Sequence, residues 1–267
     1  MTTHVSELRA REEAARLKEE FLSAAAHDLR TPLTVVLGQA ELIERRALRD
    51  PDAPIDTAGI ARMAREARRL RDLVSELLDA QRFDQGLVVL DMEPADLRAI
   101  IGAVRDRHLE HGVPLSLLEP DEPVVASVDR PRIEQVIENL LENALKYGAD
   151  DEPPSVRIWQ EDDEARIAVI DHGAGIPEGD RERIFERFYR ARNAQSITDT
   201  GMGLGLYICR RIVDNHGGRI WAEPTPGRGA TFVVALPLQP ADASESEDQP
   251  ASAPWQSNPG SEAVADA

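Results

Sequence analysis

The hydrophobic residues in the first third of the chain follow helical spacing, which predicts two helices joined by a turn. From residue 5 to residue 48 the sequence is dense in Ala, Glu, Arg and Leu. Residues 49–54 (RDPDAP) contain two prolines and two aspartates, which end the first helix. From residue 55 to residue 84 the apolar positions alternate spacings of three and four, the pattern of a bundle seam: Ile60, Met63, Ala67, Leu70, Val74 and Leu77.

A hairpin of two amphipathic helices cannot enclose a core by itself. We therefore expect it to pair with a second copy as a dimeric four-helix bundle. Packing of the hairpin against the rest of its own chain is the alternative.

After Gln85 and Gly86 the pattern changes to short apolar runs that alternate with amphipathic helices. This mixture predicts an α/β sandwich, in which helices cover one face of a mixed sheet, so the chain as a whole is α+β. The strands are expected at residues 87–92, 124–128, 155–160, 165–171, 218–223 and 230–238, and the helices at 95–112, 130–148 and 206–217. The predicted parts are a signalling helix or linker (1–14), the hairpin (15–85), the sandwich (86–239) and a tail (240–267).

Composition narrows the class of protein. The formal net charge of −18 over 267 residues argues against nonspecific binding of nucleic acid, which requires clustered Lys and Arg. The tail holds six acidic residues and no Lys or Arg, which is typical of a disordered segment that solubilises the protein or docks to a partner. Cys209 is the single cysteine, and no apolar run approaches the roughly 20 residues that span a bilayer. We expect a cytoplasmic protein, or the cytoplasmic part of a membrane-anchored sensor, without direct membrane insertion by this chain.

Three polar clusters in the second part carry candidate chemistry. The first is Asn139, Asn143 and Lys146, which share one face of the helix at 130–148 while the opposite face is apolar. Asparagine is a poor helix former, whereas its amide oxygen suits Mg²⁺ and a lysine suits phosphate. Solvated amides on a surface helix are the alternative.

The other two clusters are rich in glycine. Residues 165–177 (ARIAVIDHGAGIP) bring Asp171 from the end of a strand into a tight turn, where glycines let the backbone approach a flat ligand. Residues 200–213 (TGMGLGLYICRRIV) open a helix with three glycines and thereby present backbone N–H groups to a polyphosphate. Between them, residues 181–199 predict a basic aromatic helix and then a polar run, which together form a hinged lid.

The order of these motifs, with IFERFYR at residues 184–190 before GMGLGL, resembles the ATP-binding domain of sensor histidine kinases of bacterial two-component systems. Gyrase-type ATPases and related chaperones share that fold. Residues 21–43 (FLSAAAHDLRTPLTVVLGQAELI) resemble the phosphoacceptor segment of the same kinases. The resemblance covers about residues 15–238.

The resemblance implies roles for individual residues. His27 matches the phosphorylated histidine, Asp28 the acid beside it, and Thr31 a residue that places water to hydrolyse the phosphoaspartate of a partner. Asn143 matches the Mg²⁺ ligand, with Asn139 in support. The further positions implied to bind ATP are Lys146, Tyr147, Asp171 for the adenine amine, Gly173, Gly175, Arg187, Gly201, Gly203 and Gly205.

The implied reaction is ATP-dependent autophosphorylation of His27, followed by transfer to an aspartate on the receiver domain of a separate response regulator. The implied assembly is a homodimer that receives its input from an upstream sensor domain or protein. One rival is an ATPase of the gyrase type, which needs a glutamate base where this chain has Asn139; we expect Glu138 and Glu142 on other faces of the helix. A dimeric scaffold that binds nucleotide as a switch and an anti-sigma type serine kinase are the other rivals.

Overall fold

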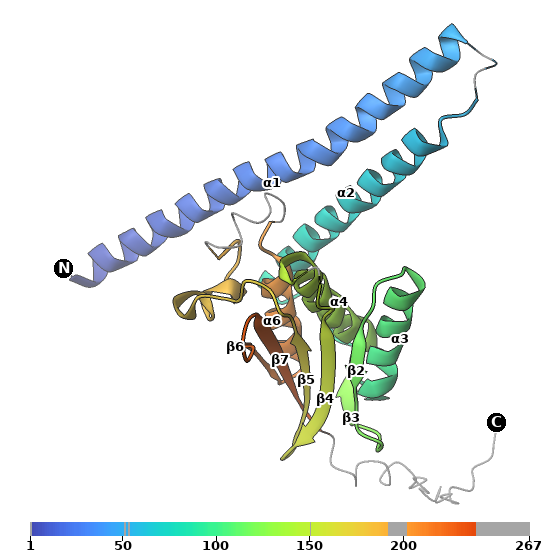
Figure 1. The fold of residues 1–267 in the computed structure, drawn as a ribbon. Coiled ribbons are helices and arrows are strands. Elements are labelled where there is room, and N and C mark those ends of the chain that lie inside the picture. The colour runs from blue at the N-terminus through green and yellow to red at the C-terminus, as the bar shows by residue number, and fades with distance from the viewer. Residues whose placement is uncertain (1, 51, 53, 150, 192–201, 239–267) are drawn as a thin grey trace, which may run out of the picture.

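The first two helices form an antiparallel hairpin (Figure 1). The structure is a computed structural model that describes residues 2–50, 52, 54–149, 151–191 and 202–238, with side chains from residue 25 onward. Helix α1 spans Thr2–Arg49 and continues through Pro32, and helix α2 spans Thr57–Asp84. Asp56 caps α2, because its side chain accepts a hydrogen bond from the N–H of Gly59 at 2.9 Å.

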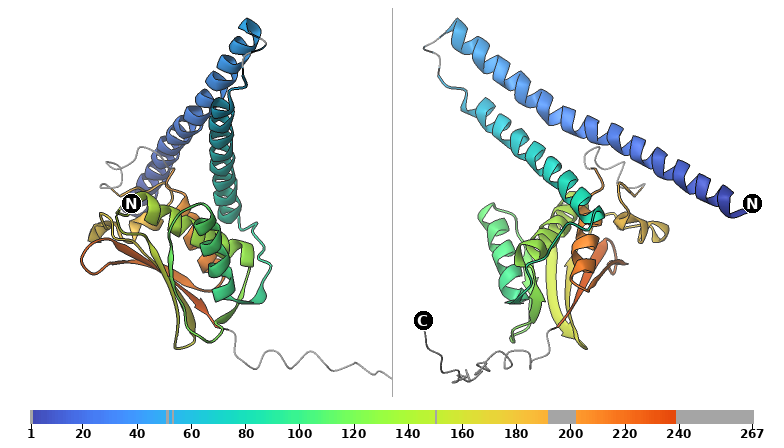
Figure 2. Two further views of the ribbon diagram at one scale, coloured as in Figure 1. Left: turned by 45° about the vertical axis from the view of Figure 1, so that its right-hand side comes forward. Right: turned by 180° about the vertical axis from the view of Figure 1, so that it is seen from behind.

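The second part is a mixed sheet with helices on one face, as predicted (Figures 1 and 2). The five strands follow the order β2-β4-β5-β7-β6; β2 and β4 are parallel, and the other neighbours are antiparallel. Strands β1 and β3 form a separate antiparallel pair. The bounds of the strands are Glu93–Asp96 (β1), Ser116–Leu118 (β2), Val125–Val128 (β3), Ser155–Glu161 (β4), Glu164–Ile170 (β5), Arg219–Pro224 (β6) and Ala230–Pro237 (β7). The covering helices are α3 (Leu97–Glu110), α4 (Arg130–Tyr147) and α6 (Gly205–Asn215).

The core lies between these helices and the sheet. Helix α4 buries one complete face there, since its apolar residues recur three and four positions apart. The strands contribute by alternation; in β4, Val156 and Ile158 are buried and Arg157 between them is exposed. The largest fully buried side chains of α4, β5, α6 and the residue that precedes α6 are Ile133, Ile137, Leu140, Leu141, Ile167, Leu204, Ile208 and Ile212.

Two predicted elements are wrong. Residues 87–92 form no strand; Val89 is 91% exposed, so the apolar run has no sheet neighbour to pair with and instead connects α2 to β1. Residues 181–190 form no α-helix either. Two single 3-10 turns, η1 (Glu178–Asp180) and η2 (Arg183–Phe185), take its place. Phe188 then adopts a φ of 67°, which a right-handed helix does not allow.

Some expectations fall outside the described residues: the tail at 240–267, Gly201, and the polar run at 192–199. Of the helices that the structure does describe, none combines the length and the apolar character needed to cross a bilayer.

His216 joins α6 to the start of α4 inside the core. Its Nε2 accepts a hydrogen bond from the backbone N–H of Asp129 at 3.0 Å, and its Nδ1 donates to the carbonyl of Ile212 at 2.7 Å. His216 is 4% exposed, and burial lowers the pKa of its ring, with the Ile212 carbonyl and Asp129 opposing the shift. The neutral ring is therefore the form that the fold requires.

We predict that His216→Leu lowers the free energy of unfolding by about 1–3 kcal/mol at neutral pH, because it leaves the buried N–H of Asp129 without an acceptor. A depressed histidine pKa stabilises the fold fully above the unfolded pKa, and this contribution is lost as pH falls through the folded pKa. The difference between wild type and variant should therefore shrink below about pH 6.5. Denaturant unfolding at several pH values measures it, with the exposed His111→Leu as control. A difference that does not vary with pH would contradict the assignment.

Candidate functional site

The polar stripe of α4 lines a cavity of about 670 Å³ between the sandwich and helix α2. Asn139, Asn143, Lys146 and Tyr147 all lie on its wall, and the ammonium group of Lys146 sits 5.3 Å from the centre of the Tyr147 ring. Asn139 lies beside the Cys209 thiol, yet its buried Nδ2 makes no hydrogen bond of ordinary geometry to a described residue. The polar side chains of α4 therefore border the cavity, while the amide nitrogen of Asn139 is buried beside the thiol.

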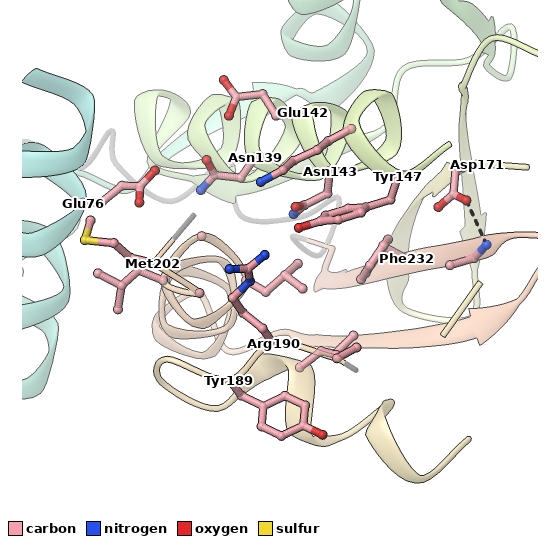
Figure 3. Close-up of a pocket in the computed structure, with 18 of the residues that line it drawn as sticks. Glu76, Asn139, Glu142, Asn143, Tyr147, Asp171, Tyr189, Arg190, Met202 and Phe232 are labelled. Atoms are coloured by element: carbon pink, nitrogen blue, oxygen red, sulfur yellow. Dashed lines mark hydrogen bonds between the residues drawn. The ribbon is translucent and has the colours of Figure 1, made fainter. Parts of the chain in front are cut away.

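Asp171 lies at the far end of the cavity, where β5 ends (Figure 3). It is 6% exposed, and one carboxylate oxygen, Oδ1, accepts hydrogen bonds from the N–H groups of Gly173 at 2.9 Å and Ala230 at 3.2 Å. Burial raises the pKa of this carboxyl, and the two N–H groups oppose the shift. The second oxygen, Oδ2, is left to accept from a ligand.

Gly173 and Gly175 allow the backbone to pack closely behind Asp171. A Cβ atom on Gly173 would lie 1.8 Å from the carbonyl oxygen of Tyr147, which no side chain permits. Gly175 has a φ of 68° and faces the carbonyl oxygen of Gly229 at 2.9 Å from the position of a Cβ. The turn after β5 therefore depends on glycine at both positions.

The N-terminus of α6 forms the wall opposite α4. Gly203 and Gly205 line the cavity, and the Cβ position of Gly205 is 3.9 Å from the side chain of Asn139. Among the described residues no side chain caps this end of α6, and N–H groups at a helix N-terminus suit an anionic ligand. Met202 and Leu204 add apolar surface beside them.

Arg187 and Arg190 lie in different places. Arg187 does not line the cavity; its Nη1 donates to Oδ2 of Asp84 at 2.5 Å. Arg190 extends into the cavity (Figure 3). Arg190 belongs to the same basic stretch as Arg187, the arginine predicted from the sequence to bind ATP. The spacing of the two residues alone does not show which of them faces the cavity.

Helix α2 closes the end of the cavity opposite Asp171 (Figure 3). The sequence left packing of the hairpin against the rest of its chain open as an alternative, but the charge pattern of α2 did not predict that this helix lines a candidate ligand site. Glu142 of α4 also lines this end, contrary to the expectation that it lies on another face, since α2 extends the cavity to that side. The contributing residues of α2 are Arg65, Arg68, Arg69, Asp72, Leu73 and Glu76.

Glu76 is the most perturbed carboxyl of this wall. Burial raises its pKa to about 7, and the neighbouring carboxylates of Glu142 and Asp72 act in the same direction, while Lys146 opposes them. A substantial fraction of the Glu76 carboxyl is therefore protonated at neutral pH. Its ionised form is disfavoured by burial and by the neighbouring carboxylates.

His27 lies on α1, outside the residues that line the cavity. Its side chain is 75% exposed, and its Nδ1 is 3.4 Å from Oδ1 of Asp28. The hydroxyl of Thr31 donates to the carbonyl of His27 at 3.2 Å, which places the two side chains one turn apart on the same helix. His27 is thus accessible to a second reactant.

Two protein families match the chain. Residues 17–86 match the His Kinase A (phospho-acceptor) domain, and residues 128–240 match the family described as histidine kinase-, DNA gyrase B-, and HSP90-like ATPase. The chain belongs to the sensor histidine kinases. The phosphoacceptor match covers most of the hairpin, including His27, and the ATPase match covers α4, Asp171 and α6.

Known relatives agree with this membership. The chain is 36% identical to the sensor protein KdpD of Escherichia coli (strain K12), over 90% of this chain and 27% of KdpD. It is 32% identical to the signal transduction histidine-protein kinase BaeS of the same organism, over 85% of this chain and 48% of BaeS. The chain thus spans less than half the length of these curated relatives.

A solved structure has a similar arrangement. The crystal structure of the histidine kinase ThkA in complex with the response regulator protein TrrA matches with a TM-score of 0.59 and 26% sequence identity. The match covers 86% of this chain and 65% of that chain.

We predict that Glu76→Gln stabilises the fold at alkaline pH. A carboxyl whose folded pKa is raised stabilises the fold below its unfolded pKa, and this contribution is lost as pH rises through the folded value of about 7. The variant keeps the neutral form at every pH, so its advantage over wild type should grow by on the order of 2 kcal/mol between about pH 5 and pH 8. Denaturant unfolding across this range checks it. An advantage that stays constant would show that Glu76 ionises normally.

Proposed function

We propose that this histidine kinase chain uses ATP to phosphorylate its own His27. The observation that carries the proposal is the cavity itself. It brings the polar stripe of α4, the carboxylate of Asp171 and the glycine-rich start of α6 around one space. The sequence separates these three elements widely, and each supplies a different part of what a nucleoside triphosphate needs.

Asp171 would recognise the adenine ring. Its Oδ1 is already engaged by two backbone N–H groups, so Oδ2 is the acceptor for the exocyclic amine of the base. Ile176 and Phe232 also line the cavity, with Phe232 toward Asp171 (Figure 3), and offer apolar surface to the faces of a flat ring.

The triphosphate would extend from there toward α2. Lys146, Arg190 and the uncapped N-terminus of α6 provide positive charge and N–H donors along that path. Asn139 and Asn143 suit a Mg²⁺ ion that arrives with the nucleotide: amide oxygens are hard neutral ligands, and the described residues contain no cluster of carboxylate, imidazole or thiol groups that would hold a metal alone. When bound, Mg²⁺ offsets the charge that develops on the phosphate oxygens.

His27 would be the nucleophile. Nδ1 lies 3.4 Å from Oδ1 of Asp28, and the tautomer with its proton on Nδ1 would leave the lone pair on Nε2. Attack by Nε2 on the γ-phosphorus forms a P–N bond and breaks the bond to the bridging oxygen, which releases ADP. The carboxylate of Asp28 offsets the positive charge that forms on the ring.

The hairpin would complete its core in a homodimer. Several of its large apolar side chains remain exposed in a single copy, including Leu33, Leu37 and Leu42 of α1 and Ile60, Val74 and Leu78 of α2. Two copies of the hairpin bury such surfaces against each other in a four-helix bundle.

The phosphoryl group would then pass to an aspartate on the receiver domain of a response regulator. Family membership and the likeness to ThkA, whose structure holds a response regulator, support this step. Thr31, one turn from His27, would place water to hydrolyse the phosphoaspartate of the partner. Input would come from an upstream sensor domain or protein, in keeping with relatives that are considerably longer than this chain.

ATP hydrolysis without phosphorylation is the second candidate, and Glu142 is the observation that favours it. Glu142 lines the cavity, and burial, together with Glu138, raises the pKa of its carboxyl, as suits a general base. Glu138 itself is engaged elsewhere, since it accepts from Arg107 at 3.0 Å and contacts Nε2 of His108 at 2.7 Å.

We predict that incubation with Mg²⁺ and γ-labelled ATP labels the chain through an acid-labile, alkali-stable bond. His27→Gln should abolish the label because the nucleophile is removed. Asn143→Ala should lower the label by at least about tenfold because the Mg²⁺ ion that holds the phosphates loses a ligand. The exposed His111→Gln serves as a control that keeps the label. Release of free phosphate that survives His27→Gln but not Glu142→Gln would instead establish the hydrolase.

We also predict that the wild-type chain is a dimer at micromolar concentration and that Leu37→Glu makes it a monomer, because a charge in an apolar interface is not solvated. Leu37 is 55% exposed in a single copy, so the substitution leaves the fold of that copy intact. Leu48→Glu, the same change near the tip of the hairpin, is the matched control. Sedimentation velocity decides, and a dimer that persists in Leu37→Glu would rule out this face.

A further inference from the structure

A single carboxylate at the end of α2 contacts two chain segments that together form one wall of the cavity. Asp84 is the last residue of α2. Its Oδ2 accepts from Nη1 of Arg187 at 2.5 Å, and its Oδ1 accepts from the hydroxyl of Tyr207. Arg187 follows the turn η2, whereas Tyr207 lies in the first turn of α6. One side chain therefore joins two stretches that are separate in the sequence.

These two stretches also contact each other. The N–H of Phe188 donates to the carbonyl of Gly203 at 3.1 Å. A Cβ atom on Gly203 would lie 2.8 Å from the carbonyl oxygen of Tyr189, so the backbones touch. Phe188 has a φ of 67°, a conformation that bulky residues adopt only when their surroundings hold them. The guanidinium of Arg187 covers the Phe188 ring at 4.5 Å and is itself fixed by Asp84.

The same two stretches carry the residues that face the ligand. Tyr189, Arg190 and Ala191 line the cavity from one stretch, and residues 202–206 line it from the other. Asp84 thus stands directly behind the part of the wall assigned above to the phosphates.

Helix α2 is firmly attached at this point. Phe83 is 2% exposed, its carbonyl accepts from Nη2 of Arg211 at 3.3 Å, and Arg132 covers its ring at 5.7 Å. One turn earlier, Oδ2 of Asp79 accepts from Arg132 at 2.9 Å and from Gln135 at 3.1 Å. Because Asp84 belongs to α2, any displacement of this end of α2 relative to the sandwich would change the contacts of Asp84 with Arg187 and Tyr207.

We propose that Asp84 is a positioning residue that couples helix α2 to the nucleotide site. While its two contacts are made, residues 187–191 stay against residues 202–207, and Arg190 and the N-terminus of α6 keep their places. When α2 shifts or rotates, the contacts break and the wall loosens. This coupling rests on the proposed function in one respect, namely that the ligand of the cavity is ATP.

The chemistry of Tyr207 agrees with a lasting contact. Burial and the hydrogen bond to Asp84 raise the pKa of its hydroxyl, while Arg211 and Arg187 oppose the shift. The hydroxyl therefore remains protonated at neutral pH and continues to donate.

Hydrogen exchange of the full chain without nucleotide tests the contact. In Asp84→Ala, peptides that cover residues 186–191 and 202–207 should exchange about tenfold faster, because hydrogen bonds to a charged group are lost. Tyr207→Phe should have a smaller effect in the same peptides, and adding it to Asp84→Ala should produce no further change. Peptides of β5 should not respond, and the exposed Asp106→Ala on α3 is the matched control.

Unchanged exchange in the wall peptides of Asp84→Ala, or an equal rise in β5, would overturn the proposal, the latter because it indicates general loss of stability. A fluorescent ATP analogue then separates this proposal from the proposed function. Wild type that binds no nucleotide contradicts the proposed function, while the exchange data still decide the contact. Wild type that binds, with affinity reduced about fivefold in Asp84→Ala, supports the coupling; unchanged affinity with a loosened wall contradicts it.

Discussion

The division of helix α4 into an apolar and a polar face is the constraint on which the rest of the sandwich depends. Its apolar face is buried against the sheet, which fixes the rotation of the helix about its own axis. That rotation leaves Asn139, Asn143 and Lys146 no direction except into the cavity. A substitution that changed the packing of Ile137 or Leu140 would therefore disturb the ligand side as well as the core, even though neither residue touches the ligand.

Helix α2 of the hairpin closes the cavity of the sandwich. Asp171 lies at one end of the cavity, and α2 forms the wall at the other end. A triphosphate bound as proposed, with its base at Asp171, would have its phosphates toward α2, which belongs to the same hairpin as α1 and His27. The charges there are mixed, since arginines of α2 lie beside Asp72 and beside Glu76, whose pKa is raised mainly by burial.

Much of this arrangement could be predicted from the sequence, because local patterns encode it. The helical period of residues 55–84 and the asparagine spacing in 130–148 depend only on neighbours in the chain, and both predicted helices are present. The strand at 87–92 was wrong because apolar content alone does not supply a pairing partner.

The inward direction of Arg190, the diversion of Arg187 to Asp84 and the wall made by α2 were missed for a different reason. Each depends on contacts between segments far apart in the chain, which no local pattern records. The order of motifs indicated that a nucleotide site exists, and only the packing of the two parts shows which side chains enclose it.

Transfer of the γ-phosphoryl group from ATP to the imidazole of His27 is the central step of the proposed function. Tandem mass spectrometry at neutral pH, after brief incubation of the wild-type chain with Mg²⁺ and ATP, tests this claim most directly. The account predicts a single phosphorylated residue, His27, with the five other histidines unmodified. Phosphate on a serine, a threonine or another histidine, or ATP consumed with no phosphorylated residue at all, would contradict it.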